Sequence, residues 1–251
     1  MTSRRELLSI IVPVYNEVRT VLAVIDRLQA IDLPVPREML IVNDGSTDGT
    51  REVLDRIESR TPNPESRLHV IHMHPNAGKG AAIRRGFNEA RGTIVAIQDA
   101  DLELDPQQLA ALVTPIVRGE TDVVYGSRFL AGRPEAPWIT IAANRGLTAM
   151  TNVLFGSSIT DMETCYKIMR TDVARSLALD ANRFDIEPQI TARLLRHGHR
   201  IHELPVRFEP RSRAQGKKIG WRDGVRALEV LVKERFRQPV GSRIPGPGSR
   251  P

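Results

Sequence analysis

Short apolar runs alternate with stretches of helical periodicity along the first half of the chain. The runs predict five buried strands, at Leu7–Val14, Met39–Val42, Leu68–Ile71, Thr93–Ile97 and Asp122–Tyr125. Between them, apolar residues that recur every three or four positions predict helices, among them Asp48–Ile57, Gly80–Ala90 and Pro106–Val117. Strands that alternate with helices are typical of a mostly parallel, Rossmann-like sheet flanked by helices. The pattern therefore predicts an α/β fold.

The second half of the chain is less regular. Its periodicity predicts helices at Asn144–Phe155, Pro188–Arg196 and Arg222–Phe236, and a strand at Arg200–Phe208. The last helix carries an apolar stripe, formed by Val225, Leu228, Val232 and Phe236. Such a stripe packs against a core or lies on a membrane surface, and packing is the more common case. We expect one domain over residues 1–236 and a disordered, basic, Pro/Gly-rich tail over 237–251.

Composition excludes several classes of protein. The 251 residues are 41% hydrophobic and 26% charged, as in ordinary soluble domains. Cys165 is the single cysteine, which excludes an internal disulfide framework and favours a reducing compartment. The N-terminus is too polar for a secretory signal, and no apolar run reaches the roughly 18 residues that a membrane span needs. These features predict a cytoplasmic protein without a transmembrane segment.

Positive charge is concentrated towards the C-terminus. The formal net charge is +6, and from Arg196 to Arg237 twelve Lys/Arg stand against five Asp/Glu. A solvated surface, a contact with anionic lipid or phosphate, and a nucleic-acid face are the three alternatives. The nucleic-acid face is the weakest, because few aromatic residues lie among these charges and no nucleic-acid motif occurs. We expect no nucleic-acid partner, and peripheral contact with the inner face of an anionic membrane stays open.

The sharpest chemical signal is the Asp99-Ala100-Asp101 motif, which directly follows the predicted strand Thr93–Ile97. If the extended geometry persists, Asp99 and Asp101 point the same way at a strand end, where open α/β sheets bind ligands. Two such carboxylates repel each other unless a cation joins them, and hard oxygen ligands suit Mg²⁺ or Mn²⁺. Glu103 continues the alternation as a third metal ligand. The alternative is a helix N-cap with first-turn acids before Pro106.

Two other predicted strands also end in polar residues. Tyr15 and Glu17 follow the first strand and offer a ring for stacking and a carboxylate acceptor. Asp44 follows the second strand and can accept hydrogen bonds from a base or a ribose, although an Asx turn is the alternative. Lys79, flanked by glycines at a predicted helix start, indicates a phosphate contact without the P-loop pattern. Acidic strand ends in one sheet predict a single ligand-binding crevice.

These motifs, taken in order, resemble the family 2 glycosyltransferases of GT-A fold. The segments that carry the resemblance are Pro13–Glu17, Asn43–Thr50, Asn76–Gly80, Asp99–Asp101 and Tyr125–Arg128. Later segments resemble the dolichyl- or polyprenyl-phosphate hexosyltransferase branch: Thr160–Lys167, Phe184–Glu187, Glu203–Val206 and Arg211–Lys218. The resemblance implies a donor half at about 8–130 and an acceptor half at about 131–236. It also implies an inverting transfer of glucose or mannose from UDP-glucose or GDP-mannose to a polyprenyl or dolichyl phosphate.

Site residues follow from these motifs. With Lys79 added from the helix-start argument, the residues expected to bind the nucleotide-sugar are Pro13, Tyr15, Glu17, Val42, Asp44, Lys79, Asp99, Ala100, Asp101, Arg128, Arg211, Lys217 and Lys218. The resemblance places Asp101 and Glu103 on the metal, Mg²⁺ or Mn²⁺, and Arg128 on the sugar or the acceptor phosphate. The residues expected to act in catalysis are Asp101, Arg128, Asp161 and Glu187.

The acceptor stays open at this point. A lipid phosphate is already anionic and needs no general base, whereas a sugar hydroxyl needs one. The candidate bases are Asp161, Glu163, Asp185 and Glu187, and their alternative role is to pair with arginines or cap helices. An enzyme of the same fold could use a saccharide or soluble acceptor in envelope polysaccharide synthesis. A non-catalytic nucleotide- or RNA-binding protein is disfavoured, because the metal-site acids are all present.

Overall fold

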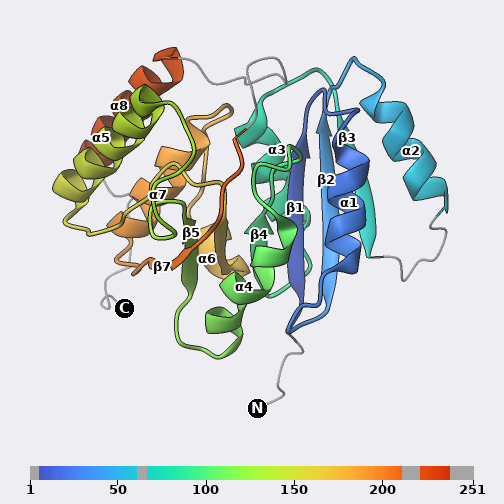
Figure 1. Ribbon diagram of the computed structural model, residues 1–251, viewed down its shortest axis with the longest axis horizontal. Helices are drawn as coiled ribbons and strands as arrows, with labels where there is room; N and C mark the ends of the chain where they lie inside the picture. Colours follow the sequence, from blue (N-terminus) through green and yellow to red (C-terminus); the bar gives the residue numbers. More distant parts are fainter. Residues whose placement is uncertain (1–5, 61–66, 211–220, 238–251) are drawn as a thin grey trace, which may run out of the picture.

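The computed structural model describes residues 6–60, 67–210 and 221–237, and a seven-stranded sheet forms its centre (Figure 1). The strands are β1 (Leu8–Val14), β2 (Arg37–Asp44), β3 (Leu68–Met73), β4 (Ile94–Ile97), β5 (Val123–Ser127), β6 (Lys167–Arg170) and β7 (His202–Pro205). Their order is β3-β2-β1-β4-β6-β5-β7, and β6 runs antiparallel to both of its neighbours. The other paired strands are parallel. The predicted α/β fold with a mostly parallel sheet is confirmed.

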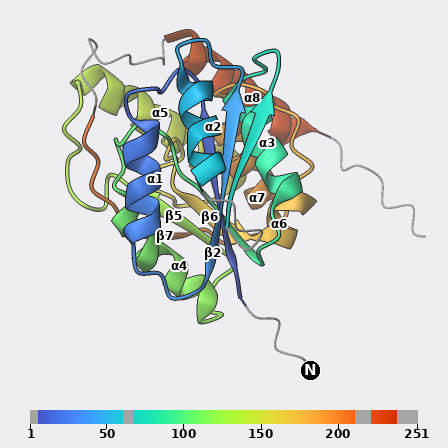
Figure 2. The same cartoon turned by 90° about the vertical axis from the view of Figure 1, so that its right-hand side faces the viewer.

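Helices cover both faces of the sheet (Figure 2). They are α1 (Val21–Ala30), α2 (Thr50–Arg60), α3 (Lys79–Glu89), the short 3₁₀ helix η1 (Pro106–Gln108), α4 (Leu109–Val117), α5 (Trp138–Phe155), α6 (Thr171–Ser176), α7 (Ile186–Arg196) and α8 (Trp221–Phe236). In Figure 2, α1 and α4 lie on one face, and α3 and α6 lie on the other. Helices α5, α7 and α8 pack against one another, and Figure 1 shows α5 beside α8 at one end of the molecule.

The core follows from strands that are apolar on both faces. The residues of β4 are all buried, and so are all residues of β1 except Pro13. Such continuous apolar runs are expected where helices cover both sides of a parallel sheet. Helix α3 approaches β1 so closely that a Cβ on Gly86 would clash with the Ile11 side chain. This close packing fixes the start of α3 relative to the carboxyl ends of the strands.

Several boundaries differ from the sequence predictions. The predicted strand Arg200–Phe208 is only His202–Pro205, and α5 begins at Trp138 rather than at Asn144. The start of α5 was missed because Trp138 and Ile139 are both exposed there and give no amphipathic signal. Strand β6 and helix α6 were not predicted, since β6 is short and has a charged residue at each end.

The single-domain division over residues 1–236 stays a prediction, and the tail beyond 237 lies outside the described residues. One large cluster of buried apolar side chains contains residues from both halves of the chain. Within residues 6–60, 67–210 and 221–237, none of the helices combines the length and the apolar composition needed to cross a bilayer.

Candidate active site

The strand register brings the predicted polar strand ends to one edge of the sheet. Pro13 of β1 pairs with Val42 of β2, and β1 also runs parallel to β4. Tyr125 of β5 lies opposite Lys167, the first residue of antiparallel β6. The carboxyl ends of β1, β2, β4 and β5 therefore share an edge with the amino end of β6, the upper edge in Figure 2. Open α/β sheets bind ligands here, and we call it the carboxyl edge.

Four charged side chains form a continuous chain of ion pairs behind this edge. Lys79 Nζ lies 2.8 Å from Asp99 Oδ1 and 3.1 Å from Glu187 Oε1. The second Glu187 oxygen lies 2.7 Å from Nζ of Lys167, which is fully buried. Burial lowers the pKa of Lys79, but Asp99 and Glu187 outweigh it and raise the pKa well above its ordinary value. Lys79 thus has two carboxylate partners within the protein. Its contact with the donor phosphate stays a prediction.

The acidic motif lies on a turn. Strand β4 ends at Ile97, Asp101 lies in the turn that follows, and Leu102 has a φ of +63°. The Glu103 amide donates to Asp101 Oδ1 at 3.2 Å. The extended geometry that would have aligned Asp99 with Asp101 does not persist beyond β4, and this expectation was wrong. Asp99 instead turns to Lys79.

A metal ion fits part of the predicted ligand set. In the described part of the chain, no three His, Cys, Asp or Glu side chains gather into a group that could hold a metal ion. Asp99 is already paired with the ammonium of Lys79. Asp101 and Glu103 are half-buried carboxylates on one turn, and such oxygens suit Mg²⁺ or Mn²⁺ that also binds phosphate. The donor set therefore fits a cation whose coordination a diphosphate completes.

Two buried side chains hold this turn in place. The hydroxyl of Tyr166 lies 2.7 Å from Gln98 Oε1 and 2.8 Å from the carbonyl oxygen of Asp105. The Gln98 amide nitrogen donates to the carbonyl oxygens of Asp99 at 3.1 Å and Leu104 at 3.2 Å. Both ends of the 99–105 segment are thereby tied to one Tyr–Gln pair. Sequence reasoning missed both residues as site components, because their partners are backbone atoms.

Replacing Tyr166 with phenylalanine keeps the ring and removes only the hydroxyl. We expect the free energy of unfolding to fall by about 1–3 kcal/mol, because Gln98 Oε1 and the Asp105 carbonyl oxygen lose a buried donor. We also expect weaker Mn²⁺ binding in the presence of a nucleoside diphosphate, since the turn that carries Asp101 loosens. Denaturant unfolding and a Mn²⁺ titration measure the two effects. Unchanged Mn²⁺ affinity would contradict the positioning role.

Asp44 binds the turn that leads into α3. It is buried; its Oδ1 accepts from the Ala77 amide at 2.8 Å, and its Oδ2 accepts from the Gly78 amide at 2.7 Å. The side-chain amide of Asn76 donates to the same carboxylate at 2.8 Å. A carboxylate of the protein thus sits where a helix start often binds phosphate. Asp44 positions the turn that carries Lys79, and its predicted contact with the nucleoside stays a prediction.

The other residues predicted to bind the nucleotide-sugar differ in their solvent exposure. Tyr15 is 38% exposed. Pro13 and Glu17 are half-buried, and Val42 and Ala100 are buried. The structure brings these residues to the carboxyl edge, and their contacts with a donor stay predictions. Three predicted cations lie outside the described residues: Arg211, Lys217 and Lys218.

Arg128 follows β5 and is held by a buried carboxylate. Its Nε and Nη2 donate to the two oxygens of Asp161, each at 2.7 Å, and its amide donates to the same side chain at 3.0 Å. Asp161 is fully buried, and the guanidinium lies 5.3 Å from the ring centroid of Phe208. Burial lowers the pKa of Arg128, but Asp161 outweighs it and raises the pKa. The pairing of Asp161 and of Glu187 favours the charge-partner role for both, and their catalytic role stays a prediction.

No ion pair of Glu163 is present among the described residues, although Arg128 and Lys167 both act on its carboxyl group. Its Oε1 is shielded from solvent and finds no hydrogen-bond partner within the described ranges of the chain. Burial raises the pKa of Glu163 to about 7; Lys167 and Arg128 lower it, and Glu187 and Asp161 raise it. A glutamate in an unfolded chain titrates near pH 4.3. Glu163 therefore carries a proton over part of the range in which ordinary carboxyls are ionised.

This raised pKa predicts a dependence of stability on pH. Between about pH 4.5 and 7 the folded state binds more protons than the unfolded state, so stability falls as pH rises through this window. Glu163→Gln removes the titration, and we expect the variant to gain about 2–4 kcal/mol relative to wild type between pH 4.5 and 8. Urea unfolding of both proteins across this range measures the difference. A constant difference would contradict the raised pKa.

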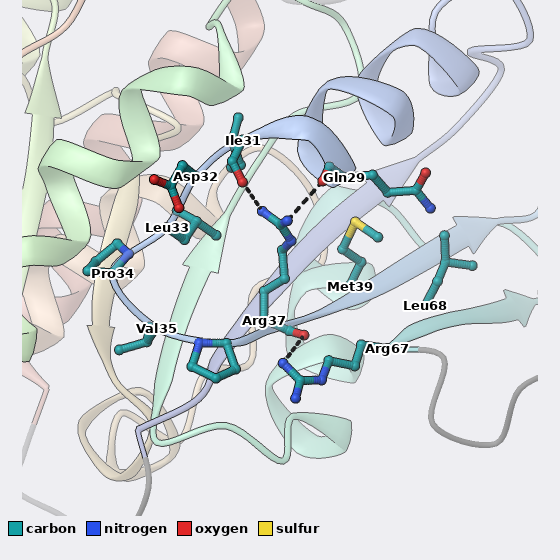
Figure 3. Close-up of a pocket in the computed structure, with 11 residues that line it drawn as sticks. Gln29, Ile31, Asp32, Leu33, Pro34, Val35, Arg37, Met39, Arg67 and Leu68 are labelled. Carbon is teal, nitrogen blue, oxygen red and sulfur yellow. Dashed lines mark hydrogen bonds between the residues drawn. The ribbon is translucent and has the colours of Figure 1, made fainter.

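A separate pocket lies at the opposite edge of the sheet (Figure 3). It has a volume of about 540 Å³ and is lined by the α1–β2 connection and the starts of β2 and β3. Its main cation is Arg37, whose guanidinium donates to the carbonyl oxygens of Ile31 at 2.6 Å and Gln29 at 2.9 Å. Because these bonds close the C-terminal end of α1, the arginine is a structural group, and the pocket is remote from the acidic turn.

Comparison with known proteins agrees with this geometry. The family model for glycosyl transferase family 2 matches residues 9–178. The chain is 30% identical over 221 residues to the undecaprenyl-phosphate mannosyltransferase of Micrococcus luteus, covering 84% of this chain and 86% of the relative. It is 29% identical to the polyprenol monophosphomannose synthase of Mycolicibacterium smegmatis, covering 84% and 80%. It is 28% identical to the glycosyltransferase AglD of Haloferax volcanii, over 81% of this chain and only a third (33%) of that relative's length.

Among solved structures, the fold resembles glucosyl-3-phosphoglycerate synthase from Mycobacterium tuberculosis in complex with Mn²⁺, UDP and phosphoglyceric acid. The TM-score is 0.69 at 19% identity, covering 94% of this chain and 81% of that one. At this identity the likeness concerns the fold alone. The family match and the shared architecture agree with the motifs from Pro13 to Arg128. The chain therefore belongs to glycosyl transferase family 2 and is a glycosyltransferase of GT-A fold.

Proposed function

We propose that this protein is an inverting glycosyltransferase that moves glucose or mannose from UDP-glucose or GDP-mannose to a polyprenyl or dolichyl phosphate at the cytoplasmic membrane face. The observation that carries the proposal is the meeting of the acidic turn Asp99–Glu103 and the cation Arg128 at one edge of the sheet. The acids would bind the donor diphosphate through a divalent cation, and Arg128 would bind an anionic acceptor. The names of the M. luteus and M. smegmatis relatives support a polyprenyl-phosphate acceptor.

The donor side uses Asp101, Glu103 and the turn that holds them. A Mg²⁺ or Mn²⁺ ion bound there would neutralise charge on the leaving nucleoside diphosphate. The Mn²⁺ and UDP of the solved glucosyl-3-phosphoglycerate synthase support a divalent ion. Asp99 supports the site indirectly, since it fixes the ammonium of Lys79. Tyr15 supplies an aromatic ring at the carboxyl edge that would stack on the base.

The acceptor side relies on a cation and needs no general base. Asp161 holds Arg128 in a two-point pair, which orients the guanidinium for a phosphate. A phosphate monoester has a second pKa of about 6, so it is anionic near neutral pH and can attack the anomeric carbon directly. Asp161 and Glu187 are both buried and paired with cations, which leaves them poorly placed to accept a proton. Their pairing supports an acceptor that is already ionised.

A surface formed by α5 and α8 supports peripheral contact with a membrane. Large apolar side chains are exposed on both helices, including Val153 (81%), Phe236 (76%) and Trp138 (69%). Basic residues lie among them: Arg145, Arg226, Lys233 and Arg235. An apolar face with cations beside it matches an anionic lipid surface, where such helices lie in the interface. The expectation that the α8 stripe packs against the core was wrong, because the residues that pack are Ala227 and Leu231. The four residues of the stripe are all exposed: Val225, Leu228, Val232 and Phe236.

The function is tested with purified protein, Mn²⁺ or Mg²⁺, polyprenyl phosphate and separately labelled UDP-glucose and GDP-mannose. We expect one donor to give a lipid-linked hexose of inverted anomeric configuration, identified by mass spectrometry and NMR. If neither donor gives a lipid product, the proposal is contradicted. Transfer to a water-soluble saccharide alone would favour the alternative acceptor class.

The membrane surface is tested by Val153→Glu/Phe236→Glu. We expect weaker sedimentation with vesicles of phosphatidylglycerol and phosphatidylcholine, because two exposed apolar contacts become anionic. Transfer to a short, water-soluble prenyl phosphate should be unchanged, since both residues lie away from the acidic turn. Equal vesicle binding by wild type and variant would contradict the docking surface.

A further inference from the structure

The segment that precedes β6 crosses the carboxyl edge and presents Glu163 from a fixed backbone. The amides of Thr160 and Asp161 donate to the carboxylate of Glu203 at 2.7 and 3.0 Å. On the far side, Thr164 Oγ1 donates to a carbonyl oxygen of β5 at 2.6 Å. Glu163 lies between these anchors, so its backbone cannot move away without breaking them.

The charged groups that face Glu163 are already paired with one another. They are Arg128, Asp161, Lys167 and Glu187. Arg128 pairs with Asp161, and Lys167 pairs with Glu187, each at 2.7 Å. Glu163 is left over, and its shielded Oε1 has no hydrogen-bond partner in the described part of the chain. A buried acceptor without a donor is unfavourable, and a ligand that supplies a donor removes this penalty.

The chemistry of the ligands decides which of them suits Glu163. The donor diphosphate and the acceptor phosphate present anionic acceptor oxygens, which a carboxylate repels. A divalent cation would bind to Asp101 and Glu103, which lie on a different segment from Glu163. The transferred hexose is neutral and rich in hydroxyl donors. The side chain of Glu163 is only half-buried, so a ligand at the carboxyl edge can reach it, and rotation of the carboxyl group exchanges its two oxygens.

We propose that Glu163 is a sugar-recognition residue, whose carboxylate accepts a hydrogen bond from a hydroxyl of the hexose carried by the nucleotide-sugar. The inference rests on the nucleotide-hexose donor of the proposed function and deepens it, because it assigns selectivity for the sugar to the acceptor half of the chain. A site built to bond a hydroxyl rejects an analogue that lacks it, since the acceptor is then left unpaired. Glu163 therefore makes the site selective for a hexose that carries this hydroxyl.

The test separates binding of the sugar from binding of the nucleotide. Calorimetry measures the Kd of wild type, Glu163→Ala and Glu163→Gln for UDP-glucose and GDP-mannose, and for UDP and GDP alone. For the donor that wild type binds, monodeoxy-hexose analogues follow. Both variants should fold. Glu163→Ala removes an unsatisfied buried oxygen, and Glu163→Gln keeps the side-chain volume. Glu120→Ala, at an exposed position, is the matched control.

We expect Glu163→Ala to weaken nucleotide-sugar binding at least tenfold while nucleoside diphosphate binding changes less than twofold. Glu163→Gln should be intermediate, because its amide oxygen still accepts without charge. One monodeoxy donor should bind wild type about tenfold more weakly and should bind Glu163→Ala as well as the parent donor does. Equal losses for nucleotide-sugar and diphosphate, or no loss, would overturn the proposal. The calorimetry contains no acceptor, so its result does not depend on the acceptor class. If Glu163 contributes to binding of the sugar but the transfer assay gives no lipid product, only the proposed function is contradicted.

Discussion

Replacing Asp101 with asparagine is expected to lower kcat/KM for hexose transfer by about 10²–10³-fold. The amide keeps the size of the side chain and its hydrogen bond from the Glu103 amide, and it removes the charge. The developing charge on the leaving diphosphate then loses part of its stabilisation. Transfer of labelled hexose at varied donor concentration measures the effect. The apparent Mn²⁺ requirement should shift to higher concentration, because one anionic ligand is gone.

Two comparisons make this result specific. Glu89→Gln removes a carboxylate from an exposed ion pair with Arg85 at the end of α3, and should leave activity within twofold of wild type. Asp99→Asn should instead reduce both activity and stability, since it leaves Lys79 with one carboxylate fewer in a buried site. If Asp101→Asn retains wild-type kcat/KM, Asp101 does not serve the donor diphosphate.

The acidic motif shows how far the sequence could predict the site. The apolar run before Asp99 and the alternation of strands with helices were enough to place it at a ligand-binding edge. The orientation of its side chains was not predictable from alternation, because the strand ends at Ile97 and the chain turns. The turn is fixed by Tyr166, which is distant in sequence and bonds a carbonyl oxygen and an amide oxygen. No local pattern records such a contact.

Asp44 gives a second example of the same limit. Its position after a buried strand correctly placed it at the carboxyl edge of the sheet. Both of its oxygens are bonded by the turn at the start of α3, which belongs to a different strand–helix unit. The sequence offered an Asx turn with the following residues as the alternative to ligand binding. The partner lay instead in the glycine-flanked segment around Gly78, which the sequence had assigned to phosphate.

Lys167 explains why the acidic residues of the second half were harder to interpret. A lysine at the start of a short strand gives no signal of burial, and β6 itself was not predicted. Its ammonium is fully buried against Glu187, the backbone carbonyls of Met162 and Thr164, and the ring of Tyr125 at 4.8 Å. Once this cation is in place, Glu187 has a structural reason to be charged. The sequence left that role and general-base catalysis as open alternatives.

Glu187→Gln is expected to separate these alternatives by its effect on stability. The substitution keeps the shape of the side chain and removes the charge that Lys167 and Lys79 share. Lys79 retains Asp99, whereas Lys167 loses the carboxylate that lies 2.7 Å from its ammonium in a fully buried site. Removing one partner of a buried pair costs about 3–5 kcal/mol, so the free energy of unfolding should fall by that amount. Guanidinium unfolding measures it, with Glu229→Gln on the exposed face of α8 as the control.

The double variant Lys167→Met/Glu187→Gln decides between a charge partner and a catalytic base. If Glu187 balances Lys167, removing both charges should restore much of the lost stability, because a buried unpaired ammonium is no longer present. Transfer activity should recover with it, since Lys79 keeps Asp99 as its partner. A general base gives the opposite pattern: normal stability in Glu187→Gln, and activity that stays lost in the double variant. That pattern would return a hydroxyl acceptor to consideration, because a phosphate acceptor needs no base.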